Sequence, residues 1–203
     1  MFKIILLLFG ILSSSIYGQM GLYGHLNVST SLTINDQAVY FYAGNVLSRD
    51  TSAHLYFLNN AQAFNASAQS YSEARVSIEG QASFQFPSGD LGKYFPLKIS
   101  EGNAAPLTLQ FHSASPPPGS FETGVTAISP HFYWSVNGQK KAKLQLVWTP
   151  QAQLEQWNDA LEELLLLGFD GAEWISIPIN YLPTIPNSTL ATSLNQGAIA
   201  TID

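Results

Sequence analysis

The residues of this chain best suited to chemistry are four histidines that lie far apart in the sequence, at His25, His54, His112 and His131. Folding could bring His112 and His131 together with Asp90 or Glu122. Their spacing, however, matches no metal-ligand pattern, and a lone histidine in a strand is usually a hydrogen-bonded core or surface residue. No cysteine occurs, which excludes thiol nucleophiles, disulfides and cysteine-based metal sites. We therefore predict no metal and no cofactor.

Motifs of familiar enzymes are also absent. The chain has no G-x-S-x-G elbow, no H-E-x-x-H helix, no phosphate-binding loop, no dinucleotide fingerprint and no EF-hand loop. Three carboxylates, Glu155, Asp159 and Glu162, share one face of a predicted helix, but like charges without a basic partner are typical of a solvated face. We predict no catalytic residues and a protein that is not an enzyme. A secreted hydrolase is the weaker alternative, because folding can assemble a triad from dispersed residues.

Aromatic side chains offer a second chemistry, since an exposed ring can stack on a sugar. The chain contains 12 Phe, 9 Tyr and 4 Trp. Trp134, Trp148 and Trp174 lie in strand patterns, where burial is the default for a large aromatic side chain. Trp157, on the predicted helix, and Tyr133, on the strand face opposite Trp134, are the expected ligand-facing aromatics. They favour a carbohydrate-binding module as an alternative function.

Composition limits the partners. Lys and Arg total 8 against 14 Asp and Glu, a net charge of −6, which argues against a nucleic-acid surface. With 46% hydrophobic and only 11% charged residues, the chain has the composition of a folded protein.

The first 18 residues have the composition of a signal peptide: a basic start at Lys3, an apolar run over 4–12 and a short polar stretch. The apolar run is too short to cross a bilayer, which needs ~20 residues. We place the cleavage after Gly18, with Ser15 as the alternative site, and expect a secreted or cell-surface protein with no transmembrane anchor in its mature chain.

Apolar residues alternate with polar ones along most of the remaining chain, which predicts half-buried strands. Residues 19–80 form a segment of short strands with polar turns, compatible with stacked rungs. Asn137-Gly138 and Asp170-Gly171 predict two hairpins, because these dipeptides suit the positive φ of a type I′ turn. Thr149, Pro150 and apolar residues at helical spacing predict one short helix over 151–162.

These elements predict an all-β, mainly antiparallel protein. Residues 81–203 are expected to form an antiparallel β-sandwich, truncated at its C-terminus if the chain is a fragment. We expect one common core to include Trp134, Leu146, Trp148, Phe169 and Trp174.

Residues 76–100 contain VSIEG, FQFPSGD and GKYFPLKIS, and this run resembles a β-rich module of secreted surface proteins in the Bacteroidota. The order continues through residues 128–129, 133–138, 144–148 and 164–174, although Phe169 stands where the module usually has Trp. The resemblance implies a type IX secretion substrate or an adhesin-like protein associated with gliding motility. It implies a non-catalytic structural or adhesion role, with an unknown surface ligand that is a glycan or a protein.

Overall fold

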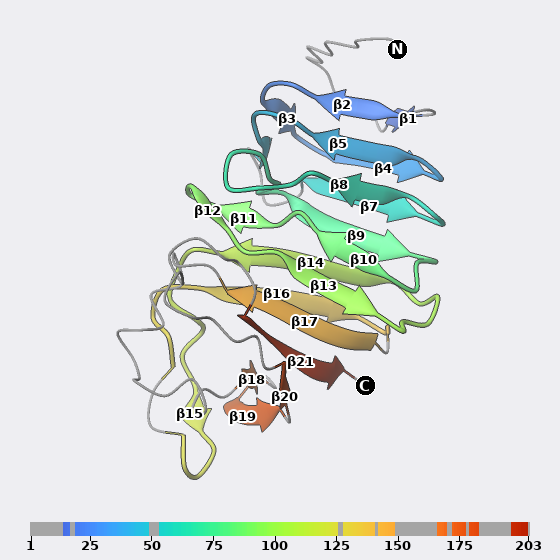
Figure 1. Ribbon diagram of the computed structural model, residues 1–203. Coiled ribbons are helices and arrows are strands. Elements are labelled where there is room, and N and C mark those ends of the chain that lie inside the picture. The colour runs from blue at the N-terminus through green and yellow to red at the C-terminus, as the bar shows by residue number, and fades with distance from the viewer. Residues whose placement is uncertain are drawn as a thin grey trace.

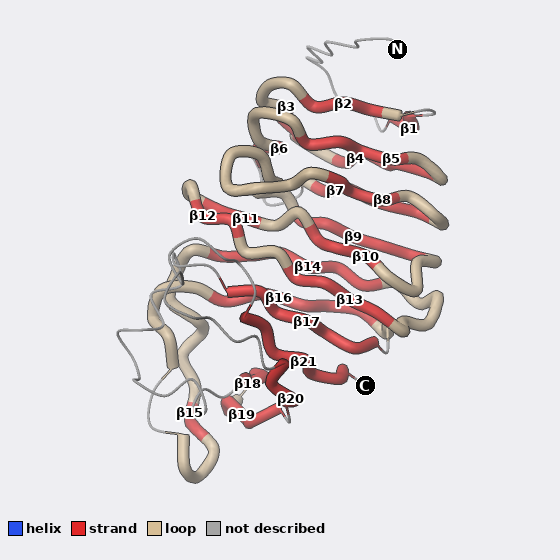
Figure 2. The backbone as a smooth tube through the Cα atoms, in the orientation of Figure 1, coloured by secondary structure: helices blue, strands red, loops and turns tan. Residues whose placement is uncertain are grey.

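The computed structural model describes residues 14–16, 19–48, 53–125, 128–140, 142–148, 166–169, 172–177, 179–182 and 196–202. All regular secondary structure within these ranges is β-strand, which confirms the all-β prediction (Figures 1 and 2). The predicted helix over 151–162 lies outside the described residues, and Trp157 lies there with it.

One long sheet runs along the whole described stack. It has six strands in the order β1 (Ser14–Ile16), β4 (Ser31–Asn35), β7 (His54–Leu58), β9 (Arg75–Glu79), β14 (Leu107–His112) and β16 (Tyr133–Gly138). The other face begins with β2 (Met20–Leu22), β5 (Ala38–Phe41) and β8 (Gln62–Phe64), and a narrow side is made by β3 (Leu26–Val28) and β6 (Val46–Ser48).

These first strands form a coil in which the chain returns to the same side once per turn (Figure 1). Every pair among β1 to β9 is parallel, including β4 with β7, β7 with β9, β2 with β5 and β3 with β6. The expected antiparallel pairing is therefore wrong for this part of the chain. Alternation shows that a strand has a buried face, but it does not show the direction of the neighbouring strand.

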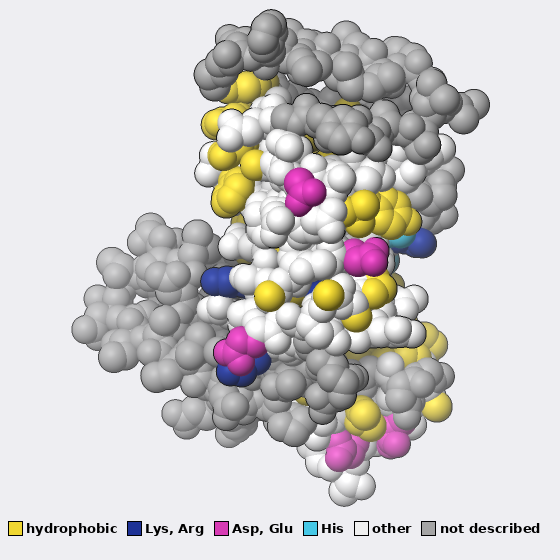
Figure 3. Space-filling model, turned by 90° about the vertical axis from the view of Figure 1, so that its right-hand side faces the viewer, with side chains coloured by type: hydrophobic (Ala, Val, Ile, Leu, Met, Phe, Trp, Pro, Cys, Tyr) yellow, Lys and Arg dark blue, Asp and Glu magenta, His cyan; other side chains and the backbone are white. Residues whose placement is uncertain are grey.

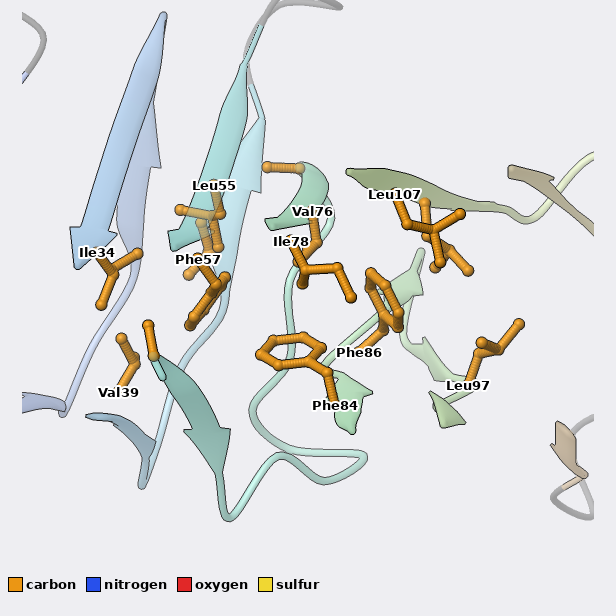
Figure 4. Packing of buried hydrophobic residues seen from close by; sticks show 14 of the residues in the cluster. Ile34, Val39, Leu55, Phe57, Val76, Ile78, Phe84, Phe86, Leu97 and Leu107 are labelled. Carbon is orange, nitrogen blue, oxygen red and sulfur yellow. The ribbon is translucent and has the colours of Figure 1, made fainter. Parts of the chain in front are cut away.

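The interior of the coil consists of columns of like side chains contributed by successive turns. Ile34, Phe57 and Ile78 come from β4, β7 and β9 at adjacent register positions, and each is at most 1% exposed. Figure 4 shows them facing Val39 and Phe84 of the opposite layer. Alternation along each strand thus produces a closed apolar core, as the period of two requires.

A left-handed residue follows the end of each strand at one corner of the coil. Asp36, Asn59 and Gly80 have φ values of 52°, 58° and 95°. The backbone N–H of Asn59 donates to the Glu79 carbonyl at 2.8 Å, and its side-chain amide donates to Asn35 Oδ1 at 2.6 Å. Because Asn, Asp and Gly tolerate positive φ best, this corner is built from the residue types that its geometry requires.

Beyond β9 the pairing becomes mainly antiparallel. The strand β14 pairs with both β9 and β16 in this way. On the other layer, the antiparallel sheet has five strands in the order β10 (Phe84–Phe86), β13 (Leu97–Ser100), β17 (Ala142–Trp148), β21 (Gln196–Ile202) and β20 (Ile179–Leu182). Two small sheets complete the described fold: β11 (Gly89–Asp90) with β12 (Lys93–Tyr94), and β15 (Ser120–Phe121), β19 (Glu173–Ile177) and β18 (Leu166–Phe169). The exception to antiparallel pairing among these named strands is β15, which pairs parallel with β19.

The hairpin predicted at Asn137-Gly138 is wrong, because β16 and β17 belong to different sheets. A buried lysine lies in the connection between them. Lys140 is 3% exposed, and its Nζ donates to the Gln81 carbonyl at 3.0 Å and to the Asn103 carbonyl. These bonds hold the connection against the interior, so the chain crosses to the other layer. The pairing predicted around Asp170-Gly171 is present, with β18 antiparallel to β19.

The five residues predicted to share one core are divided. Leu146 belongs to the main core, and Trp134 packs against both that core and a smaller aromatic group around Phe95 and Phe111. Trp174 is 6% exposed and packs on Phe169, with ring centroids 4.9 Å apart, in the separate three-stranded sheet. The side chain of Trp148 lies outside the described residues.

Candidate ligand-binding surface

The outer face of the six-stranded sheet carries a continuous set of polar and aromatic side chains. Their neighbours in each strand point into the core, so alternation leaves these residues on the outside. We call this set the outer polar face, and its members on four adjacent strands are His54, Tyr56, Arg75, Ser77, Thr108, Gln110, His112, Tyr133 and Ser135.

Four of these groups form a hydrogen-bonded chain across three strands. The Tyr56 hydroxyl lies 3.1 Å from His54 Nδ1, and His54 Nε2 lies 3.1 Å from Ser77 Oγ. Ser77 Oγ lies 2.7 Å from Thr108 Oγ1. Each of these three hydroxyl groups and both ring nitrogens of His54 therefore have a hydrogen-bond partner, and these bonds orient the imidazole of His54.

A serine beside a histidine raises the question of nucleophilic catalysis. Ser77 is 6% exposed, and its hydroxyl is already shared between His54 and Thr108. The group on the far side of the imidazole is the Tyr56 hydroxyl, not a carboxylate. In a serine hydrolase the third group is an acid that stabilises the imidazolium formed during the reaction. The Ser77–His54 pair therefore has the spacing of a nucleophile and its base, but it lacks the carboxylate that would stabilise the imidazolium, and Ser77 is buried away from a substrate.

Arg75 lies next to His54 across the β7–β9 pair. Its Nε donates to Gln110 Oε1 at 3.2 Å, and Arg75 makes no ion pair with a carboxylate in the part of the chain that the structure describes. Burial lowers the pKa of His54, and the positive charge of Arg75 lowers this pKa further. The imidazole of His54 is accordingly neutral at pH 7.

His112 and Tyr133 form the other end of the face. Their rings stack with centroids 4.4 Å apart and an angle of 11°, and His112 Nε2 lies 2.9 Å from Ser135 Oγ. Burial lowers the pKa of His112, Asp90 raises it and Arg75 lowers it. Tyr133, predicted as a ligand-facing aromatic, is half-buried, and one face of its ring is covered by His112.

The combination of His112, His131, Asp90 and Glu122 considered from the sequence is not assembled as a hydrogen-bonded site. Asp90 Oδ2 accepts the backbone N–H of Ser113 at 2.9 Å. Glu122 Oε2 accepts both the backbone N–H and the hydroxyl of Ser176, at 2.6 and 2.7 Å. Among the described residues, no histidine nitrogen is hydrogen-bonded to a carboxylate.

The bond of Asp90 joins two segments that are remote in sequence, because its partner Ser113 begins the connection after β14. The turn between β11 and β12 has positive φ at Leu91 (49°) and Gly92 (81°). Tyr71 fastens this turn, because its buried hydroxyl accepts the Gly92 N–H at 2.8 Å and donates to Glu73 at 3.3 Å.

The opposite layer carries a column of four aromatic side chains, Tyr23, Tyr42, Tyr40 and Phe64. Successive ring centroids are 4.7, 6.1 and 5.2 Å apart, and successive ring planes differ by at most 27°. Figure 3 shows hydrophobic side chains along one edge of the upper half of the molecule, where this layer is seen from its side. The rings cover one another's faces, so they present mainly edges to solvent although Tyr23 is 56% exposed. This geometry favours a structural stack over a platform for sugars.

Sequence reasoning missed most of the outer polar face. Of its members, Tyr133 was selected for ligand contact, His54 and His112 were considered and set aside, and Arg75 and Ser77 were not selected. The sequence spacing of successive turns could have identified this face, because residues that are one turn apart become neighbours in a parallel coil.

Comparisons with protein-family models, curated proteins and solved structures gave no match. Within the described ranges, no group of three or more histidine and acidic side chains is arranged to hold a metal ion. A search of these same residues finds no helix with the length and apolar character needed to span a membrane.

Proposed function

We propose that this chain is a non-catalytic extracellular module of a secreted cell-surface protein, with a structural or adhesive role. The observation that carries the proposal is the outer polar face. It lies on a stack of paired strands and holds two serine–histidine pairs, Ser77 with His54 and Ser135 with His112, and neither imidazole is hydrogen-bonded to a carboxylate among the described residues. Such a surface is suited to holding a ligand without transforming it.

The signal-peptide composition of residues 1–18 and the resemblance of the chain from about Val76 to its C-terminus to Bacteroidota surface modules support export to the cell surface. Secretion by the type IX route belongs to the same proposal. So do the sandwich packing of residues 81–203, the short helix over 151–162 and a role for Trp157 in ligand contact.

Expression of the complete reading frame in a Gram-negative host tests the location. We expect the exported protein to begin at Gln19 by N-terminal mass spectrometry, so that its six-stranded sheet lacks β1 (Ser14–Ile16), and to be accessible to protease on intact cells. Retention of residues 1–18 in a cytoplasmic product would refute the export proposal.

Assays of the purified protein on ester, peptide and glycoside substrates test the absence of catalysis. We expect no turnover above that of a variant that carries both Ser77→Ala and Ser135→Ala. Turnover by the unmodified protein that this variant lacks would overturn the proposal, because one of the two serines would then act as a nucleophile.

A carbohydrate-binding module is the second candidate. It is favoured by the imidazole and phenol rings at both ends of the outer polar face, His54 with Tyr56 and His112 with Tyr133. A glycan array separates the two candidates. Micromolar binding that falls on Tyr133→Ala substitution supports the carbohydrate-binding module, and adhesion without glycan binding supports the first candidate.

A further inference from the structure

We propose that the outer polar face binds a carboxylate group of an acidic polysaccharide, with Arg75 as its main contact and His54 and His112 on either side. This inference rests on the carbohydrate-binding candidate above and specifies its ligand. It is carried by the position of a single arginine among neutral hydrogen-bonding groups.

Charge on this face differs from the charge of the whole protein. The chain carries a net charge of −6, yet Arg75 and Glu79 are the only residues in the sequences of β7, β9, β14 and β16 that carry a permanent charge. They stand at opposite ends of β9, about 13 Å apart at the rise of an extended strand. Arg75 is thus a cation without a paired carboxylate in the described part of the chain.

The guanidinium of Arg75 is oriented for a planar anion. Its Nε is held by Gln110 Oε1 at 3.2 Å, and no other hydrogen bond of Arg75 occurs within the described residues. The two terminal amino groups thus have no hydrogen-bond partner among the described residues, and together they have the fork geometry that pairs with both oxygens of a carboxylate.

The flanking ring pairs supply contacts for the sugar through their edges, because His112 and Tyr133 cover each other's faces. His54 and Tyr56 have ring centroids 4.5 Å apart on β7, and His112 and Tyr133 form the second pair on β14 and β16. The two ring pairs are separated by two to three strand spacings, about 10–14 Å. A short oligosaccharide lying across the strands can reach both pairs while its carboxylate meets Arg75.

Protonation of the histidines should be coupled to binding. The groups that face His54 are Tyr56, Ser77 and Arg75, while Ser135, Tyr133, Asp90 and Arg75 act on His112. Because both imidazoles are neutral at pH 7, a bound carboxylate favours proton uptake by them. Affinity should then rise as the pH is lowered from about 7.5 to about 5.5.

Calorimetry of the complete exported protein tests the proposal with two probes of equal length, a mannuronate oligosaccharide from alginate and the neutral mannose oligosaccharide. We expect the acidic probe to bind. The neutral probe should bind at least about tenfold more weakly, because it has no carboxylate to form a charge-assisted hydrogen-bonded pair with Arg75. Arg75→Gln should weaken the acidic probe about tenfold to a hundredfold, and Arg75→Lys should not restore it fully.

Lys98→Gln is the matched control, because it removes the same charge from an exposed position on β13 in the other layer. Equal weakening in both variants would mean that the acidic probe responds to net charge alone, which overturns the proposal. Equal binding of both probes would also overturn it while the carbohydrate-binding candidate stands. Failure of both probes, with binding of other glycans absent on an array, would refute the candidate as well.

Discussion

Replacement of Phe57 by Ala tests the register of the coil at its centre. Phe57 lies on β7, its side chain is 0% exposed, and its ring centroid is 5.0 Å from that of Phe84 in the opposite layer. The matched variant is Phe64→Ala on β8, where the same residue type is 42% exposed and stacks on Tyr40.

The expected cost follows from what each ring contacts. Truncating a fully buried phenylalanine typically destabilises a protein by about 3–5 kcal/mol, because the transfer energy is lost and a cavity remains. Phe64 should lose mainly the ring pair with Tyr40, about 0.5–1.5 kcal/mol. At roughly 2–4 °C per kcal/mol for a chain of this size, the melting temperature should fall by about 6–20 °C for Phe57→Ala and by about 1–6 °C for Phe64→Ala.

Thermal melts followed by far-ultraviolet circular dichroism, together with urea titrations at 25 °C, provide the measurement. A slip of one residue in the strand register would exchange inward and outward side chains along a strand. If Phe64→Ala proved as destabilising as Phe57→Ala, the assignment of the two faces would be refuted.

Three further substitutions test other features. Gly80→Ala should lower the free energy of unfolding by about 1–3 kcal/mol, because φ is +95° and the new Cβ would lie 3.1 Å from the backbone of Asn59. Gly24→Ala is the control, since a Cβ there has open space around it, and the urea midpoints of the two variants provide the comparison. Glu73→Gln should stabilise the protein at pH 7 but not at about pH 4, because burial and Asp90 raise the pKa of Glu73. The contribution of Glu73 to stability is therefore present below about pH 4.5 and is lost as the pH rises through its folded-state pKa. A variant that is less stable than the unmodified protein at pH 7 would contradict this. Ser77→Ala should cost about 1–3 kcal/mol by leaving its two partners unsatisfied, and an unchanged unfolding midpoint would show that the hydrogen-bonded chain contributes nothing.

The alternation of apolar residues was sufficient to predict strands and their buried faces. Leu55 and Phe57 are inside and Tyr56 is on the outer face, as the period of two requires. Strand direction was a different matter. A short polar turn can reverse the chain into a hairpin or carry it around a corner, and the corner residues Asp36 and Asn59 suit both outcomes.

The hairpin predicted at Asn137-Gly138 shows how tertiary contacts override a strong local signal. A Cβ on Gly138 would lie 2.4 Å from the Pro106 carbonyl oxygen, so this glycine serves close backbone approach. Two residues later Lys140 binds carbonyls of Gln81 and Asn103, which are remote in sequence. The Asn137-Gly138 dipeptide itself gives no indication of these contacts with Pro106, Gln81 and Asn103.

The outer polar face was hidden for a related reason. His54 and Ser77 are separated by one turn of the coil, and Ser77 and Thr108 by a longer connection. Until the pairing of β7, β9 and β14 is known, the sequence contains only isolated polar residues in strands. Tyr133 was identified because its neighbour Trp134 was expected to point inward, which required the geometry of one strand alone.

The parallel pairing of the first turns determines where this protein unfolds locally and where its sequence can be lengthened. Each turn touches only the turns before and after it, so the coil behaves as a one-dimensional array whose stability is a sum of neighbour terms. Among the described residues, the turn containing β2 and β3 has one such neighbour, and its amides should exchange with solvent sooner than those of β7 and β9. The antiparallel strand β14 ends the array at the other side. A gene duplication of one turn could therefore lengthen the protein between β2 and β9 without disturbing the five-stranded sheet, and the distance between its two ends would increase by one strand spacing, ~4.8 Å, for each turn added.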